Sequence, residues 1–186
     1  MNDSSNNNSF KVLAFSPDLK LQGLKDFDCG DANLNGYLRK KLKREFERDN
    51  INALLLLNES DEVVGFVTAR PYHLGREDVP SGVFPYSLAP SVTVMQIPML
   101  AIDKKYQKQG WGLELMRAAL DYSLESAALV KGIKGVYLDA LESAKPFYES
   151  FDFQAMSEEI SPNGTIRMLI SMDALRAASL GWQDAS

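Results

Sequence analysis

The sequence predicts a mixed α/β fold in which helices flank one central sheet. Segments typical of strands alternate with amphipathic helical segments along the chain. With 186 residues, 45% of them hydrophobic, the chain can bury one sizeable core, and it shows no internal repeat. We therefore expect a single domain at residues 10–186. The Asn/Ser-rich segment 1–9 lacks a signal-peptide pattern, and we expect it to be a disordered leader.

The first half of the chain contains three predicted strands and one helix. Residues 10–15 alternate loosely between apolar and polar side chains and predict the first strand. Asp31 is a favourable residue for a helix start. An apolar stripe then recurs at every fourth position, at Leu34, Leu38, Leu42 and Phe46. Apolar runs at 53–57 and 63–68, joined by a polar turn, predict a hairpin. Residues 69–93 are rich in Pro, Gly and Ser, and we expect a long loop there with one turn of helix at most.

The second half begins with the apolar run 95–102, which is long enough for a strand and too short for a buried helix. An amphipathic helix follows, with its apolar side chains at Leu113, Met116, Leu120, Leu124 and Ala127. Gly135–Leu141 predicts another strand, and 143–150 a short helix with its proline in the first turn. We expect a last hairpin at 151–156 and 166–172, and a terminal helix at 173–180.

A glycine-containing turn, Gln107-Lys108-Gln109-Gly110-Trp111-Gly112, joins the central strand to its helix. Glycines at a helix start let a ligand approach the backbone, and the first-turn N–H groups lack intrahelical partners. Together with the helix dipole they form an anion site, which suits a pyrophosphate. The turn lacks the Gly-Lys-Ser/Thr ending of a nucleotide P-loop and the three-glycine dinucleotide pattern. A plain strand–helix connection is the alternative.

The motif Gln-x-x-Gly-x-Gly, after Leu-Ala-Ile-Asp and before an amphipathic helix, resembles the acetyl-CoA motif of GCN5-related N-acetyltransferases, the GNAT superfamily. The resemblance implies the GNAT fold, a central mixed twisted sheet with splayed strands and flanking helices, and acetyl-CoA as acyl donor. It also implies a bulged strand at 97–102 whose backbone pairs with the pantetheine arm. The cofactor-binding residues that it implies are Leu100, Ala101, Ile102, Gln107, Lys108, Gln109, Gly110, Trp111 and Gly112.

Residues 147–153, Phe-Tyr-Glu-Ser-Phe-Asp-Phe, resemble the second signature of this superfamily, which implies that Tyr148 lies beside the CoA sulfur. When an amine attacks the thioester, the leaving thiolate gains from a proton donor. A phenol, with a reference pKa near 10, is a neutral donor at neutral pH. Taken alone, a tyrosine on a short helix between two Phe residues is more often a core residue, and the motif match reverses that preference. Asp152 stands where relatives have Gly, and Asp tolerates a left-handed turn better than most residues.

The attacking amine must be neutral, and the sequence offers few general bases. His73 is interpreted as an exposed loop residue. Asp139 and Glu142 could accept a proton through water or could be structural acids. A lysine amine would call for a base, whereas an α-amine, with a reference pKa of about 7.7–8.0, is already substantially neutral. The short list of bases favours an α-amine acceptor.

The segment 27–38, Phe-Asp-Cys-Gly-Asp-Ala-Asn-Leu-Asn-Gly-Tyr-Leu, resembles the N-terminal signature of the toxin acetyltransferases of bacterial toxin–antitoxin pairs. This resemblance extends from about Phe27 through Met172. It implies acetylation of the α-amino group of an aminoacyl-tRNA and silencing by a ribbon-helix-helix antitoxin. It also implies direct transfer, with Cys29 as a small buried residue and not a nucleophile. Met99 is a departure, because many relatives have a basic residue there.

Charge is unevenly distributed along the chain. The net charge is −5, yet residues 39–48 alone carry +4. A phosphate backbone binds such clusters through counterion release, even on an acidic protein. The predicted tRNA-binding residues are Arg39, Lys40, Lys43 and Arg44, supported by Lys104, Lys105 and Lys108 next to the glycine turn. The alternative is a solvated helix face that keeps the protein in solution.

Other classes of protein fit less well. No apolar run approaches the ~18 residues of a membrane span. One cysteine excludes an internal disulfide and fits a reducing cytoplasm, and one histidine with one cysteine argues against a zinc site. Two further hypotheses remain: an ordinary GNAT enzyme that acts on a small amine or a protein amine, and a non-catalytic acyl-CoA-binding module. The oligomeric state stays open, a homodimer included.

Overall fold

The structure, a computed structural model, describes residues 10–183, so the expected leader at 1–9 lies outside the described residues. The chain forms two compact units. The first unit comprises Met1–Thr68 and Met99–Ala119, and the second comprises Ala69–Pro98 and Leu120–Ser186. Each unit is described separately below. In residues 10–183, no helix combines the length and the apolar character needed to cross a bilayer.

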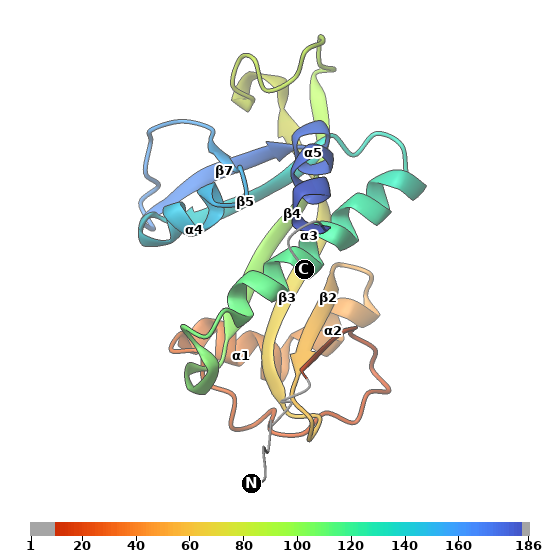
Figure 1. The fold of residues 1–186 in the computed structure, drawn as a ribbon, viewed down its shortest axis with the longest axis vertical. Coiled ribbons are helices and arrows are strands. Elements are labelled where there is room, and N and C mark those ends of the chain that lie inside the picture. The colour runs from red at the N-terminus through yellow and green to blue at the C-terminus, as the bar shows by residue number, and fades with distance from the viewer. Residues whose placement is uncertain (1–9, 184–186) are drawn as a thin grey trace, which may run out of the picture. The chain divides into compact units, whose positions relative to one another are not determined.

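Seven strands make one sheet in the order β1-β2-β3-β4-β5-β7-β6 (Figure 1). The sheet is mixed because β5 runs parallel to β4 and antiparallel to β7. The strands are β1 Lys11–Ala14, β2 Asn52–Leu57, β3 Val63–Gly75, β4 Ser91–Ile102, β5 Gly135–Leu141, β6 Gln154–Ala155 and β7 Thr165–Ser171. The helices are α1 Ala32–Lys40, α2 Leu42–Glu47, α3 Trp111–Leu129, α4 Lys145–Glu149 and α5 Met172–Gln183. Short 3-10 turns cover Arg76–Asp78, Lys104–Tyr106 and Glu142–Ala144. The predicted mixed α/β class is confirmed.

In the first unit, the predicted helix starts as expected and then divides. The Asp31 carboxylate accepts the N–H groups of Asn33 at 2.7 Å and Leu34 at 3.2 Å, which begins α1. Helix α1 ends at Lys40, and α2 begins at Leu42 after Lys41, whose φ of −114° is unusually extended for a helix. Residues spaced by four rotate about 40° per step around a straight helix, so the stripe would turn away from the core. The break returns Phe46 to the core, where its ring lies 5.2 Å from that of Phe15.

The predicted hairpin between β2 and β3 is confirmed. The side-chain carbonyl of Asn58 accepts the N–H groups of Ser60 and Glu62, each at 3.0 Å, and Asp61 takes a positive φ of 58°. Asn and Asp suit such turns because they bond their own backbone and tolerate this conformation. On the other side of β2, β1 pairs antiparallel, with Val12 opposite Leu56.

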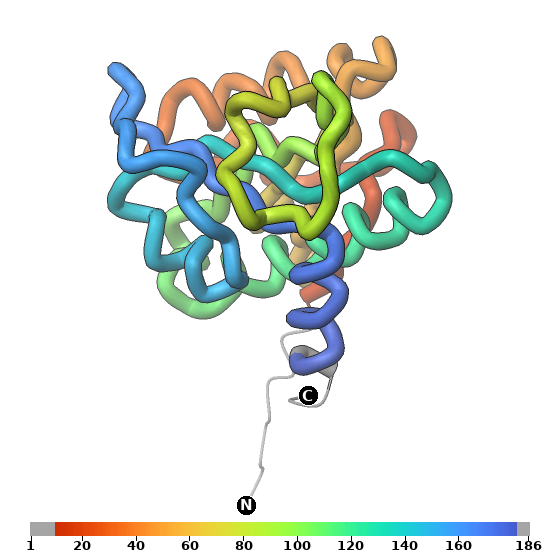
Figure 2. Tube along the Cα trace, turned by 90° about the horizontal axis from the view of Figure 1, so that it is seen from above, coloured from red at the N-terminus to blue at the C-terminus, as the bar shows by residue number. Residues whose placement is uncertain are grey.

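The prediction of a long loop over residues 69–93 is wrong. Strand β3 continues to Gly75 and β4 begins at Ser91, so the irregular segment is the shorter loop drawn in yellow-green in Figure 2. Arg70–His73 is exposed and contains a proline, so it shows no apolar alternation. Polar pairs hold these strand ends together: Arg70 Nε donates to Gln96 Oε1 at 2.8 Å, and His73 Nδ1 lies 3.2 Å from Thr93 Oγ1.

In the second unit, β5 and β7 pair antiparallel along their whole length, from Gly135 opposite Ser171 to Leu141 opposite Thr165. The buried side chains of this unit include Val94, Tyr137 and Leu169. The expected strand at 151–156 is reduced to β6, because the chain makes a tight turn after α4 first. The last hairpin and the terminal helix α5 are present as predicted.

Candidate active site

Strand β4, a 3-10 turn and helix α3 build the predicted cofactor turn. At the end of β4, the Asp103 N–H donates to the Val64 carbonyl at 2.8 Å, and the Asp103 carboxylate caps the turn by accepting the Lys105 N–H at 2.9 Å. The Gly110 carbonyl accepts the N–H groups of Leu113 and Glu114. Helix α3 thus starts at Trp111, within the predicted turn and before its second glycine. The N–H groups that precede the first intrahelical bond have no partner within the helix.

The backbone of this turn fits a pyrophosphate. Gly110 has φ +89°, a conformation in which a residue with a side chain is strained, and Lys108 also has a positive φ of 60°. A Cβ on Gly110 would meet nothing within 4 Å, and one on Gly112 would meet Ile102 Cγ1 at 3.9 Å. The space in front of both glycines is therefore open, which allows an anion to approach the N–H groups at the positive end of α3.

Two side chains of the predicted cofactor set serve the turn itself. The Gln107 amide donates to the carbonyls of Cys29 at 2.9 Å and Ile102 at 2.8 Å, and the Gln109 amide donates to the Lys105 carbonyl at 2.9 Å. These amide donors are therefore engaged within the protein. The Trp111 ring lies 3.9 Å from that of Phe10, centroid to centroid.

The predicted pantetheine strand is the last part of β4. Leu100 is half-buried, whereas Ala101 and Ile102 are buried. The parallel ladder to β5 comprises Met95 with Val136 and Gln96 with Tyr137.

Tyr148 lies on α4 in the second unit, between aromatic rings. Its ring centroid is 5.0 Å from that of Phe147 and 6.1 Å from that of Phe153. Burial raises the pKa of Tyr148 above its ordinary value, and no charged neighbour contributes to the shift. The phenol therefore stays neutral at physiological pH. Asp152 has φ +65°, which confirms the left-handed turn expected there.

The second unit also holds the candidate bases. Asp139 accepts a hydrogen bond from the Tyr137 hydroxyl at 2.8 Å. Burial, followed by this bond, raises the pKa of Tyr137 strongly. Glu142 is exposed in the turn after β5. His73 is exposed as predicted, but it lies in β3 and not in a loop.

The comparison with protein families decides the class of this fold and site. An acetyltransferase (GNAT) domain matches residues 15–172, which cover most of the chain. The chain is a GNAT acetyltransferase.

Relatives of this acetyltransferase include toxins. A tRNA-acetylating toxin of Mycobacterium tuberculosis is 28% identical over 152 residues, 81% of this chain and 87% of the relative. A crystal structure of a bacterial toxin has a TM-score of 0.86 at 28% identity, covering 92% of this chain and 95% of that one. The AtaT protein complexed with acetyl-methionyl-tRNAfMet has a TM-score of 0.77 at 25% identity, covering 91% and 98%.

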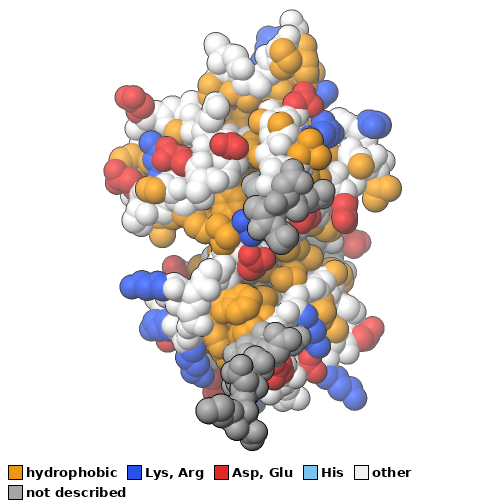
Figure 3. Space-filling model, in the orientation of Figure 1, with side chains coloured by type: hydrophobic (Ala, Val, Ile, Leu, Met, Phe, Trp, Pro, Cys, Tyr) orange, Lys and Arg blue, Asp and Glu red, His pale blue; other side chains and the backbone are white. Residues whose placement is uncertain are grey.

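The predicted tRNA-binding cations of this acetyltransferase are not equally free. Arg39 donates to the Phe27 carbonyl, Lys43 pairs with Glu47 at 3.8 Å and Arg44 with Glu45 at 3.4 Å. Lys40 is exposed on α1, and no ion pair to it is found in residues 10–183. On the face seen in Figure 3, basic side chains gather beside the part of the first unit that holds α1 and the turn before α3.

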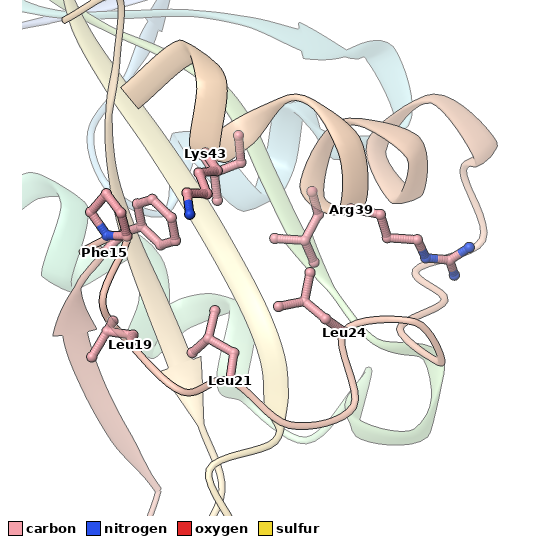
Figure 4. Close-up of a pocket in the computed structure, with 9 residues that line it drawn as sticks. Phe15, Leu19, Leu21, Leu24, Arg39 and Lys43 are labelled. Carbon is pink, nitrogen blue, oxygen red and sulfur yellow. The ribbon is translucent and has the colours of Figure 1, made fainter. Parts of the chain in front are cut away.

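A separate cavity of about 230 Å³ lies in the first unit, under α1 and α2 (Figure 4). Apolar side chains form most of its wall, and Arg39 extends away from them. Its lining residues are Phe15, Pro17, Leu19, Leu21, Leu24, Leu38, Arg39, Leu42 and Lys43. None of the predicted cofactor residues is among them, so this cavity is distinct from the cofactor turn.

Three residues that were not among the predicted site residues hold the cofactor turn from outside, namely Asp28, Asn35 and Asp103. The Asp28 carboxylate accepts hydrogen bonds from the Lys104 ammonium at 2.9 Å and from the Asn35 amide at 2.8 Å. The signal was present in the 27–38 motif, whose Asp and Asn are polar residues at fixed spacing. Cys29, expected to be buried, is half-buried, and desolvation raises the pKa of its thiol. A raised pKa agrees with an unreactive cysteine.

Proposed function

We propose that this acetyltransferase transfers the acetyl group of acetyl-CoA to the α-amino group of an aminoacyl-tRNA and thereby blocks translation. The likeness to the tRNA-acetylating toxin carries this proposal, because it extends over 81% of the chain. The AtaT complex adds a solved relative that holds an acetylated aminoacyl-tRNA. As in toxin–antitoxin pairs, an antitoxin would silence the enzyme in the cytoplasm. Residues 10–186 would act as one catalytic domain.

The cofactor turn and Tyr148 divide the catalytic work. Acetyl-CoA supplies an activated thioester, and its pyrophosphate is held by the backbone N–H groups at 110–112. The acceptor nitrogen bonds to the acetyl carbon as the carbon–sulfur bond breaks, and the nitrogen loses a proton. Tyr148 donates a hydrogen bond to the departing sulfur, and the thiol leaves protonated. A phenol kept neutral by burial is suited to this role.

An α-amine acceptor suits the few candidate bases that the described residues 10–183 provide. Asp139 already accepts the Tyr137 hydroxyl, and His73 lies against Thr93. Proton removal therefore falls to water or to Asp139 through water. An α-amine needs little help, because its reference pKa lies near 8.

The decisive experiment supplies purified protein with charged tRNAs and labelled acetyl-CoA. We expect label on the aminoacyl group of at least one tRNA, and none on the same tRNA after deacylation. Absence of label on every charged tRNA of a complete bacterial set contradicts the proposal. In cells, expression without a partner should arrest growth.

A further inference from the structure

The segment 27–31, which we call the signature segment, is bonded to the chain that leads into the cofactor turn. The Lys104 N–H donates to the Asp28 carbonyl at 2.8 Å, and the Lys104 ammonium donates to the Asp28 carboxylate at 2.9 Å. The Asp28 N–H in turn donates to the Asp103 carboxylate at 2.8 Å. Asp28 and Asp103 are 75 positions apart in the sequence, so these bonds connect two distant parts of the first unit.

Gln107 makes the contact nearest to the glycines. Its side-chain nitrogen bridges the Cys29 carbonyl of the signature segment and the Ile102 carbonyl at the end of β4. One amide therefore fixes three chain segments at the first residue of the Gln-x-x-Gly-x-Gly motif. Because both acceptors are carbonyls, the position requires a donor that carries two hydrogens, such as an amide.

The signature segment is itself held rigidly on α1. The Asp28 carboxylate accepts the Gly30 N–H at 2.9 Å and the Asn35 amide at 2.8 Å, and Asn35 accepts the Cys29 N–H at 2.9 Å. The Phe27 ring, which is 1% exposed, anchors the segment in the core. The bonds from Lys104, Gly30 and Asn35 lower the pKa of Asp28 to about 2, so its carboxylate is ionised at neutral pH.

A carboxylate is an unexpected neighbour for an anion site, because like charges repel. If Asp28 acted only through its charge, it would weaken the binding of the pyrophosphate. Four of its five hydrogen bonds instead connect the signature segment to Asn35 on α1, to Asp103 after β4 and to Lys104 in the 3-10 turn that precedes the glycines, and the fifth is to Gly30. Preorganised donors bind more tightly than mobile ones because less ordering entropy is lost on binding.

We propose that Asp28 and Gln107 are positioning residues that brace the cofactor turn, so that the N–H groups at 110–112 face the acetyl-CoA pyrophosphate before it binds. This inference deepens the proposed function and rests on its assignment of the cofactor turn. The signature segment then has a structural role, because it holds the cofactor turn in a fixed position relative to α1.

The test is a calorimetric titration of Asp28→Asn with acetyl-CoA, without any acceptor. We expect the Kd to rise about tenfold. If only the charge of Asp28 matters, removal of this negative charge should lower the Kd for acetyl-CoA. The positioning role and the charge effect therefore predict changes in Kd of opposite sign. Asp173→Asn is the matched control, because it removes the same charge from an exposed aspartate that pairs with Arg176 at 2.8 Å on α5 in the second unit. Its Kd should equal that of the wild type.

Gln107→Met is the second variant, because it keeps the side-chain length and removes both bonds. In both variants the KM for acetyl-CoA should rise, with kcat and the acceptor KM little changed. A structural role alone would lower the melting temperature and leave the Kd of the folded protein unaltered. An unchanged or lower Kd for acetyl-CoA in both variants contradicts the proposal that Asp28 and Gln107 position the cofactor turn. The titration needs no acceptor, so it tests the positioning role independently of the substrate. A wild-type protein that binds acetyl-CoA yet never acetylates tRNA would contradict the proposed substrate and leave the positioning role intact.

Discussion

Tyr148 combines a packing role with the catalytic role proposed for it. Its ring packs between two phenylalanines, and the same burial that stabilises the packing raises the pKa of the phenol. A raised pKa extends the neutral, donating form to higher pH. Read by itself, the tyrosine favours a core role, whereas the motif favours a catalytic role, and the burial of the ring is compatible with both.

We predict that Tyr148→Phe lowers kcat roughly 100-fold while the Kd for acetyl-CoA changes little. The substitution keeps the ring and removes the donor. Stopped-assay kinetics and calorimetry measure the two quantities. In the wild type the rate should rise with pH as the amine becomes neutral, and it should not fall before pH 10, because the raised pKa keeps Tyr148 protonated. Unaltered turnover in Tyr148→Phe would move the donor role elsewhere.

Gly112 offers a sharper test of the cofactor turn than Gly110, because its conformation does not strain a side chain and a Cβ has room there. We predict that Gly112→Glu abolishes stabilisation by acetyl-CoA in thermal melting, since a carboxylate then meets the pyrophosphate. Gly112→Gln has nearly the same shape without the charge and should retain part of the effect. Equal stabilisation of Gly112→Glu and the wild type would remove the pyrophosphate from this turn.

At the scale of elements, the sequence predicted those whose side chains alternate or repeat. The hairpin of β2 and β3, strand β5 and helix α3 follow from apolar periodicity, and the structure confirms them. The far ends of β3 and β4 could not be predicted, because exposed residues such as Arg70 and His73 are held by cross-strand polar pairs and not by burial. The break at Lys41 depends on the core that both helices share, which the local sequence does not contain.

Two glycines in regular elements should respond to alanine with opposite signs. A Cβ on Gly65 in β3 would meet the Ala101 carbonyl oxygen at 2.8 Å, so Gly65→Ala should destabilise the fold by about 1–3 kcal/mol. A Cβ on Gly36 in α1 would meet nothing within 4 Å, so Gly36→Ala should stabilise it by roughly 0.5–1 kcal/mol. Urea unfolding followed by circular dichroism compares them. Equal effects would show that the approach of β4 to Gly65 is looser than described.

At the scale of the whole molecule, motifs in the sequence indicate the candidate site, whereas the residues that support it are only partly evident from the sequence. The glycine turn and Tyr148 belong to short signatures that can be read locally. The partners of Asp28 and Gln107 lie far away in sequence, so no local pattern reveals them. The same applies to the basic residues. The sequence does not reveal which cations are already engaged, and the Arg39 guanidinium donates a hydrogen bond to the Phe27 carbonyl.

The charge asymmetry of the molecule gives the last prediction. If the cations of α1 and α2 contact tRNA phosphates, Lys40→Glu and Arg44→Glu should each weaken tRNA binding and reduce the slope of log affinity against log salt by about one unit. Lys131→Glu makes the same change in net charge at an exposed lysine of the second unit and is the control. Filter binding across salt concentrations measures the slopes. The affinity for acetyl-CoA should stay constant in all three variants, because the glycine turn is untouched. Equal losses in Lys131→Glu and Lys40→Glu would mean that net charge, and not this helix face, governs tRNA binding.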